Sequence, residues 1–481
     1  MSDIGSTTAG RAALRPIRFA WPAIDLSQPL GEVAGVVLLT PILLSVAIWN
    51  GFPIIFYDTG AYMLQGLGHV FVAERSPIYS GFLAATGGAV SLWLVAFAQC
   101  LISAFVMTEF ARAVRPSLSL WAFVGLGATL CIATGLPWYA GQIEPDCFVA
   151  VVPLALYLFA FHGPTLGVVR STLLFVTAVV AIACHNSHVA LAGGMVVVLA
   201  IMRVAPVAWI EAHALPRPKL VLAVASLIAA IATVYAANYA FTKHFFFSHS
   251  GAIFLEARLM EDGLIKPILD TDCPNGARYK ICPYKDKLPA HADTWLWMEQ
   301  KSPFHKLGGF RKRAPESALL VAESLKRYPL ENAIVAIENT VLQFFWFQTG
   351  DGIVPQEWVL NTEFKIAIPQ QVSAYDRAYQ QEGEIWFLPI NLVHVPVAFL
   401  TLAALYLMLR DIVRCRDWKA GMLPALVLIA LIGNALVCSV FSGPHGRYQS
   451  RIMWLPTFVL ALAAWPKIED QLQRRIGSSR A

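Results

Sequence analysis

Apolar residues occur along this chain in long runs that are separated by short polar segments. Many of the runs reach roughly 18–25 residues, enough for a helix to cross a hydrocarbon core of about 30 Å. A helix on a soluble protein would instead carry a narrower apolar stripe on one face. We predict an all-α polytopic membrane protein with about ten transmembrane helices, at 31–49, 81–110, 118–136, 147–162, 170–184, 189–203, 219–241, 387–409, 421–441 and 452–466.

One long polar segment, residues 242–386, interrupts this pattern. The predicted organisation is a tail at 1–30, a seven-helix core at 31–241, the polar segment, three helices at 387–466 and a tail at 467–481. Within the polar segment, residues 315–345 have helical spacing, and their second half is amphipathic and ends in Phe-Phe-Trp-Phe. That half is typical of a helix in the membrane interface. The alternative is a buried helix of a small globular domain.

Composition agrees with a membrane protein, since 57% of the residues are hydrophobic, 14% are charged and the mean hydropathy is +0.58. A soluble protein of 481 residues needs more charge to cover its surface. The net charge of +5 therefore indicates orienting loops rather than a nucleic-acid partner. The N-terminal tail does not resemble a cleavable signal, because Trp21, Pro22 and Asp25 interrupt the apolar stretch that a signal needs.

Loop charge predicts the orientation. With the N-terminus in the cytoplasm, most basic loop residues fall inside, whereas the short outside loops carry only Arg75, Arg447 and Arg451. We therefore predict a multi-pass protein of the bacterial inner (plasma) membrane, with both termini cytoplasmic and the polar segment outside. Cys273 and Cys282 lie close together in that segment, and an oxidising compartment favours a disulfide between them.

Four of the outside loops carry the candidate chemistry. Polar residues near membrane depth are costly unless they pair, face water or serve a function. In this chain acids, histidines and arginines gather on the same predicted side, which is the strongest functional signal in the sequence. The candidate site residues are Asp58, Glu74, Arg75, Gln142, Glu144, Asp146, His185, His188, His445, Arg447 and Arg451.

The acidic candidates also have structural interpretations. Asp58 is placed to cap a short helix. Glu74 and Arg75 favour a local salt bridge at the start of the next helix. Asp146 is placed to cap the following helix, and equally to share a divalent cation with Glu144 through oxygen ligands.

The basic candidates point to an anion. His185 and His188 are three residues apart, and hydrogen bonding is favoured over zinc because the spacing supplies no further ligands. Arg447 and Arg451 follow a helix break, and the arginine fork suits phosphate and pyrophosphate. Snorkelling to lipid headgroups is the alternative. Acids and arginines together suit transfer of a group from an anionic donor.

Asp58 in the motif FYDTG, followed by Glu144 and Asp146 as an ExD-like pair, gives a layout that resembles the GT-C superfamily of polyprenyl-phosphate-dependent glycosyltransferases. The resemblance covers about 31–240. FYDTGAY, RSPIYSGFL, GQIEPD and SGPHGRYQSR are also similar to motifs of a group of uncharacterised bacterial membrane proteins. Three departures are plain: Thr59 rather than a second acid follows Asp58, the WWDYG motif is absent, and the polar segment precedes the last three helices.

The resemblance implies an inverting enzyme that moves a sugar from a polyprenyl-phosphate donor to an envelope glycan, lipid or protein on the periplasmic face. It implies that Asp58 acts as the base on the acceptor hydroxyl. It implies that Glu144 and Asp146 position a divalent cation, Mg or Mn, or the acceptor. The other candidates would contact substrate, with Arg447, Arg451 and His445 at the lipid phosphate, His185 and His188 in the pocket wall, and Glu74, Arg75 and Gln142 beside it. Membrane lipids are expected partners, and nucleic acid is not.

Two other classes of protein stay open. A transporter or flippase places its polar residues near the bilayer midplane on broken helices of repeated halves, whereas this chain places them at one mouth and has no evident repeat. A non-enzymatic assembly protein of envelope polysaccharide export would not need Asp58. The chain has no Walker A loop or strand-linked glycine-rich turn, which argues against a cytoplasmic nucleotide-sugar donor.

Overall fold

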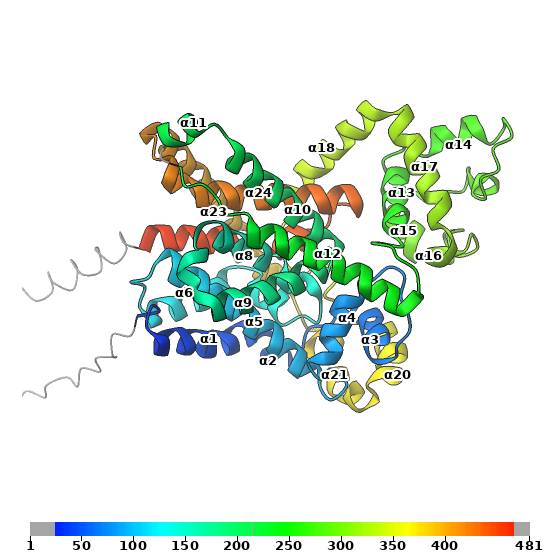
Figure 1. The fold of residues 1–481 in the computed structure, drawn as a ribbon. Helices are drawn as coiled ribbons and strands as arrows, with labels where there is room; N and C mark the ends of the chain where they lie inside the picture. The colour runs from blue at the N-terminus through cyan, green and yellow to red at the C-terminus, as the bar shows by residue number, and fades with distance from the viewer. Residues whose placement is uncertain (1–24, 214, 466–481) are drawn as a thin grey trace, which may run out of the picture.

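The computed structural model describes residues 25–213 and 215–465, and it shows a helical protein in which a bundle of long helices carries a smaller unit at one end (Figure 1). Residues 1–24 and 467–481 of the predicted tails lie outside the described residues. In the described part, β pairing is confined to isolated bridges that join Asp25 to Ser119 and Ile54 to Gln142.

The helices of the first half of the chain are α1 (Pro29–Leu43), α2 (Ser45–Asn50), α3 (Thr59–Leu67), α4 (Pro77–Ala85), α5 (Leu92–Val114), α6 (Leu120–Ala133), α7 (Leu136–Ala140), η1 (Pro145–Phe148), α8 (Val151–Phe161), α9 (Gly163–Ala183), α10 (Asn186–Val204), α11 (Val207–Ala212) and α12 (Val221–Thr242). Those of the second half are α13 (Gly251–Glu261), α14 (Lys266–Asp272), η2 (Cys282–Tyr284), α15 (Ala292–Trp297), α16 (Gly309–Lys312), α17 (Ala314–Arg327), α18 (Pro329–Phe345), α19 (Glu357–Val359), η3 (Leu360–Phe364), α20 (Lys365–Ala367), η4 (Pro369–Gln371), α21 (Val372–Asp376), α22 (Tyr379–Glu382), α23 (Phe387–Cys415), α24 (Trp418–Phe441) and α25 (Gly446–Ser450).

Seven stretches of the described chain are long and apolar enough to cross a membrane, namely α1 with α2, α5, α9, α10, α12, α23 and α24. Two further apolar stretches, α6 and Pro145–Phe161, are shorter, and a helix at 454–465 runs to the end of the described part. The chain is thus a helical, polytopic membrane protein. The full set of ten spans stays a prediction.

The predicted helix at 81–110 is wrong, because the structure divides it into the end of α4 and most of α5. Gly87 has a φ of 90°, a conformation that glycine adopts without the steric cost a side chain brings. Ser91 then starts α5, and its hydroxyl accepts a hydrogen bond from the Trp93 N–H at 3.3 Å. Hydropathy alone did not show this turn, because the residues around it are apolar.

Helix α8 lies at the centre of the bundle, where α5, α9 and α10 pack around it. Its residues are apolar on every side and almost all are buried. A helix that is hydrophobic all round belongs in such an interior position. Far from the smaller unit, Glu32 of α1, Glu109 and Arg112 of α5 and Arg170 of α9 form connected ion pairs that tie three helices together.

The polar segment contains a compact unit, which we call the α13–α17 unit. It has its own apolar core, in which Trp295, Phe304 and Leu320 are fully buried. Cys273 and Cys282 form a disulfide, which confirms the predicted pairing. The unit lies at one end of the bundle (Figure 1), which we call the loop end.

Helix α18 leads from this unit back to the bundle and packs along α24 (Figure 1). Helical structure over 315–345 is confirmed, with a break at Tyr328 between α17 and α18. The apolar side chains Ile337, Val341 and Phe345 of α18 are exposed, whereas Asn332 and Gln343 are buried. The buried-helix alternative is therefore wrong, and α18 turns an apolar face outward, as a helix in the membrane interface does.

The predicted orientation is tested with Cys415, which is exposed at the end of α23. A Glu299→Cys variant should react with a membrane-impermeant maleimide in cells whose outer membrane has been permeabilised. Cys415 should react only once the inner membrane is opened, and Cys415→Ser identifies its signal. Labelling of Cys415 in cells with a closed inner membrane would contradict the orientation.

Candidate functional site

Backbone pairing joins the loop before α3 to the loop before α8. The Ile143 N–H donates to the Ile54 carbonyl at 2.9 Å. The Thr59 hydroxyl donates to the Ile143 carbonyl at 2.9 Å and reaches a carboxylate oxygen of Glu144 at 3.4 Å. Asp58 directly precedes Thr59, so this pairing brings the first predicted acid next to the second although 86 residues separate them in the chain.

Asp58 occupies the N-cap position of α3, but its side chain makes no capping hydrogen bond. It forms an ion pair with Arg75 instead. The predicted local salt bridge between Glu74 and Arg75 is therefore absent among the described residues. Arg75 instead donates a hydrogen bond to the backbone carbonyl of Glu74 at 3.1 Å. The Arg75 guanidinium also lies 5.5 Å from the ring centre of Trp297, which links it to the α13–α17 unit.

Glu144 is the acid without a close cation. Glu144 is only 2% exposed, and no Arg, Lys or His of the described chain lies within ion-pair distance of its carboxylate. Burial raises its pKa well above the ordinary value, and the neighbouring charges of Asp58 and Asp146 raise it further. Glu144 therefore holds a proton more readily than an ordinary carboxylate, which is typical of acids that exchange protons in functional sites.

Asp146 is held by arginines from the other end of the chain. It lies in η1 and forms a buried ion pair with Arg451, which follows α25. Arg447 approaches the second oxygen of Asp146 at 3.9 Å. Arg451 is 1% exposed. Its guanidinium also contacts Cys438 Sγ at 3.2 Å, Asn434 Oδ1 at 3.3 Å and Ser187 Oγ at 3.4 Å.

Arg447 is more open than Arg451. Its guanidinium lies 4.0 Å from the ring centre of Phe56 and 4.8 Å from that of Tyr448. Its side chain is 13% exposed, and its ion pair with Asp146 is long. Its Nη2 donates to the Tyr448 hydroxyl at 3.4 Å, so the Arg447 guanidinium has weaker contacts than that of Arg451, whose Nη1 and Nη2 both contact buried protein atoms. Of the two predicted phosphate ligands, Arg447 is the one with access to a ligand.

His445 connects the bundle to the α13–α17 unit. Its Nδ1 lies 3.6 Å from Asp351 and its Nε2 lies 3.6 Å from Asp293 of α15. Burial raises the pKa of Asp351, but the hydrogen bond from His445 and the nearby Arg447 outweigh burial and bring the pKa below its ordinary value. Asp351 is thus a carboxylate that stays charged beside the two basic groups.

The histidine pair has structural roles. His185 is the N-cap of α10, where its Nδ1 accepts from the Ser187 N–H at 3.2 Å. The Nδ1 of His188 bonds to a backbone carbonyl of α9 at 2.8 Å, and the two rings lie 5.4 Å apart. Gln142 is buried, and its backbone carbonyl accepts from the side chain of Gln99 at 2.6 Å. These contacts agree with hydrogen bonding rather than a metal site.

The residues fit a divalent cation poorly. Asp58 already pairs with Arg75, and Asp146 pairs with Arg451. A cation shared by Glu144 and Asp146 would have to sit beside these guanidinium groups. In the described part of the chain, no group of three or more His, Cys, Asp or Glu side chains is arranged to hold a metal. Arg75 and Arg451 balance the charges of Asp58 and Asp146 in this structure, and a divalent cation at Glu144 and Asp146 stays a prediction.

The sequence analysis missed Asp351, which belongs to the site, and also Asp293 and Trp297, which contact His445 and Arg75 from the α13–α17 unit. We use the name polar cluster for Asp58, Arg75, Glu144, Asp146, Asp351, His445, Arg447 and Arg451. The sequence around Asp351 indicated a turn, since this residue lies between two glycines shortly after the aromatic end of α18. Both glycines have positive φ. No sequence pattern pointed to Asp293 and Trp297, because only the position of the α13–α17 unit brings them to the cluster.

A comparison of the chain with protein-family models, with curated proteins and with solved structures found no match. A function is therefore inferred from the geometry of the site, because a fold alone does not define an activity.

The buried ion pair gives a prediction about stability. Asp146→Asn leaves Arg451 buried without its counter-charge, and we expect a loss of about 3–5 kcal/mol of folding free energy, measured by thermal unfolding in detergent. The double variant Asp146→Asn/Arg451→Gln should be less destabilised than the sum of the two single variants. Additive losses would contradict direct pairing.

Metal removal tests the predicted cation. Because arginines balance Asp58 and Asp146, we expect EDTA to change substrate binding and any turnover by the purified protein by no more than about twofold. Removal of a catalytic metal would cause a much larger loss. A loss that Mg²⁺ or Mn²⁺ restores would show that Glu144 and Asp146 hold a cation.

Proposed function

We propose that the chain is a GT-C-like glycosyltransferase that moves a sugar from a polyprenyl-phosphate donor to an acceptor at the periplasmic face. One observation carries the proposal: Asp58, Glu144, Asp146 and Arg447, which come from three loops, lie in one polar cluster. A cluster that combines carboxylates with an accessible arginine suits proton removal from a hydroxyl and departure of a phosphate.

In the proposed reaction, the acceptor hydroxyl attacks the anomeric carbon of the donor sugar. The bond from that carbon to the phosphate oxygen breaks as the new C–O bond forms, and the phosphate leaves with the bonding electrons. Asp58 accepts the hydroxyl proton through the oxygen that Arg75 does not hold. Attack from the face opposite the leaving group inverts the configuration at the anomeric carbon.

Arg447 stabilises the phosphate that leaves, because its guanidinium is held in place by Phe56 and Tyr448 but has only a long ion pair. Arg451 has a positioning role, since it fixes Asp146 and does not reach solvent. Glu144 lies beside Asp58 with a raised pKa, and it is placed to share the proton that Asp58 receives.

The position of the cluster supports an enzyme over a transporter. Asp58 follows α2, His185 precedes α10 and His445 follows α24, so the polar residues lie at helix ends. A transporter would place its substrate site near the midplane, on interrupted helices. The proposal that the cluster faces the periplasm rests on the distribution of charged residues among the loops, which predicts that the loop end lies outside.

Replacement of the proposed base is the direct test in cells. Asp58→Asn removes the proton acceptor while it keeps the shape of the side chain, and we expect the rate of sugar transfer to fall by about 100- to 10,000-fold. The readout is the envelope glycan and glycolipid profile. Asp411→Asn, at an exposed position at the other end of the bundle, is the matched control and should keep the wild-type profile.

An unchanged profile in an Asp58→Asn strain with normal membrane insertion would overturn the catalytic role. It would favour a non-enzymatic assembly protein, whose function does not depend on Asp58.

A further inference from the structure

Arg75 lies in an irregular segment, residues 68–76, between α3 and α4. No helix fixes the direction of its side chain, so the position of its guanidinium depends on what that group contacts. One Nη pairs with Asp58, and the other donates to the Glu74 carbonyl at 3.1 Å. Its Nε is buried without a hydrogen-bond partner in the described part of the chain. Hydrogen bonds within the bundle therefore occupy two of the three guanidinium nitrogens.

The α13–α17 unit supplies a further contact to this guanidinium. The central carbon of the Arg75 guanidinium lies over the Trp297 ring, 5.5 Å from the ring centre, which is within the range of a cation–π attraction. An arginine can contact an aromatic ring while its N–H groups donate to other partners. Trp297 thus limits movement of the guanidinium away from Asp58 without competing for its N–H groups.

Trp297 is held in place by the unit itself. It is the last residue of α15, whose residues Trp295 and Leu296 are buried in the core of the unit. The Trp297 ring packs against Phe310 at 5.2 Å and Phe254 at 6.2 Å between ring centres. The position of the ring is therefore determined by the core of the unit rather than by Arg75.

The unit in turn is attached to the bundle through the end of α13. The carboxylate of Asp262, which follows α13, accepts a hydrogen bond from Asn339 of α18 at 3.2 Å. Arg258 pairs with Asp262, and a Cβ built on Gly443 would lie 3.3 Å from its guanidinium. These contacts fix the unit at the loop end, where Trp297 reaches Arg75.

The second contact from α15 is weaker. Asp293 is four residues before Trp297, so the two share one face of the helix. It lies 3.6 Å from His445, longer than a hydrogen bond, and its side chain is 56% exposed, so this pair contributes little. His445 does not depend on it, because its backbone N–H and carbonyl both bond to the side chain of Gln343 at 2.8 Å.

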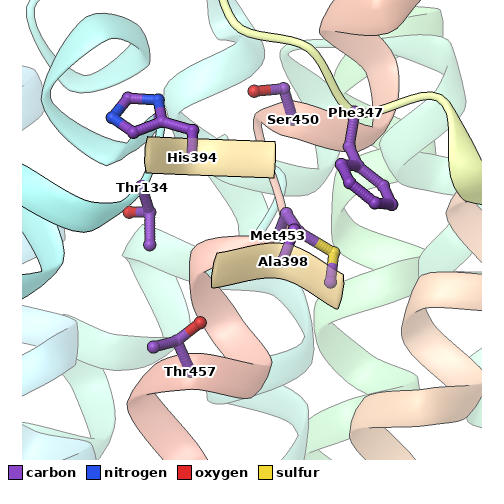
Figure 2. Close-up of a pocket in the computed structure, with 8 residues that line it drawn as sticks. Thr134, Phe347, His394, Ala398, Ser450, Met453 and Thr457 are labelled. Carbon is purple, nitrogen blue, oxygen red and sulfur yellow. The ribbon is translucent and has the colours of Figure 1, made fainter. Parts of the chain in front are cut away.

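Asp351 is likewise anchored within the bundle. The hydroxyl of Thr349, two residues earlier, lies 2.9 Å from both His394 of α23 and Ser450 of α25. Figure 2 shows His394 and Ser450 beside a cavity of about 10 Å³, close to the smallest space that holds one water molecule. This side of the polar cluster is therefore closely packed without the unit, whereas the side that carries Arg75 is completed by the unit.

We propose that Trp297 is a positioning residue of the polar cluster, which holds the Arg75 guanidinium in its ion pair with Asp58. The α13–α17 unit thereby determines how Asp58 presents its other oxygen to an acceptor. The inference rests on the proposed function for the role of Asp58 as the base, whereas the contact itself does not. It assigns a role to a residue outside 31–240, the part of the chain that resembles the superfamily.

The contact is tested with phenylglyoxal, an arginine reagent, on the full chain in lipid nanodiscs, with modification of Arg75 followed by mass spectrometry. Trp297→Leu should raise the rate of modification about 2- to 30-fold, the range of one cation–π contact. Trp297→Phe keeps a smaller ring and should give an intermediate rate. Asp293→Asn, on the same helix face, is the matched control and should react as wild type. A wild-type rate in Trp297→Leu would overturn the proposal.

A second arginine reports the fold of the unit in the same sample. Arg327 pairs with Asp272 within the unit, and its rate of modification should be that of wild type in every variant. If Arg327 reacts faster in Trp297→Leu, the unit has loosened and Trp297→Phe decides. Faster modification of Arg75 with unchanged Arg327 in Trp297→Phe would support the contact, and a wild-type rate there would overturn it.

Sugar transfer separates positioning from substrate binding. We expect Trp297→Leu to lower kcat about 10- to 100-fold and to change the KM for the donor by no more than about twofold, because a misdirected base slows the chemical step. Trp297→Phe should restore most of the rate. Trp358→Leu, at an exposed tryptophan of α19, is the control and should keep wild-type kinetics. A raised KM with unchanged kcat in Trp297→Leu would overturn the positioning role.

Modification of Arg75 needs no turnover, so failure of this inference is distinct from failure of the proposed function. Faster modification in Trp297→Leu, without sugar transfer by the wild-type protein, would keep the contact and remove the glycosyltransferase. Sugar transfer by the wild-type protein, with an unchanged rate of Arg75 modification in Trp297→Leu, would keep the enzyme and remove the role of Trp297.

Discussion

The buried ion pair between Asp146 and Arg451 is the constraint on which the loop end depends. Two charges taken out of water cost several kcal/mol each unless they meet a partner, so the folded chain that buries these two residues is stabilised when they pair. The pair joins η1, just before α8, to the residue after α25, across 305 positions of sequence.

This constraint separates the roles of the two arginines. Arg451 is buried, and both of its Nη groups contact protein atoms, whereas Arg447 is held by aromatic rings and has only long polar contacts, to Asp146 and to the Tyr448 hydroxyl. Arg75 has an intermediate position, since it pairs with Asp58 and also contacts Trp297 of the α13–α17 unit. The cluster thus contains both fixed charges that determine its shape and charges that are available to a ligand.

The sequence predicted the helical class, the main spans and the disulfide, because hydrophobic runs and cysteine spacing report directly on local chemistry. It also selected Asp58, Glu144, Asp146 and Arg447 as one group. It did not predict which charge pairs with which. Arg75 pairs with a residue 17 positions away rather than with its neighbour, and that choice depends on how the loops pack.

Contacts from the polar segment were the least predictable part. His445 meets Asp293 only because the α13–α17 unit lies at the loop end, and no local pattern encodes that position. The turn between α4 and α5 was missed for a different reason, since glycine conformation rather than hydropathy creates it. The exposed apolar face of α18 was ambiguous in sequence, because an amphipathic pattern does not tell which face is buried.

We propose that the polar cluster transfers a sugar from an isoprenyl-phosphate carrier. The most direct measurement is release of isoprenyl phosphate by the purified chain in nanodiscs, supplied with a radiolabelled isoprenyl-phosphate sugar and an extract of envelope acceptors. We expect time-dependent release, with the label moved to an acceptor, by the wild-type protein and not by Asp58→Asn. Release at the same rate by both proteins, or by neither under conditions in which the donor is bound, would contradict it.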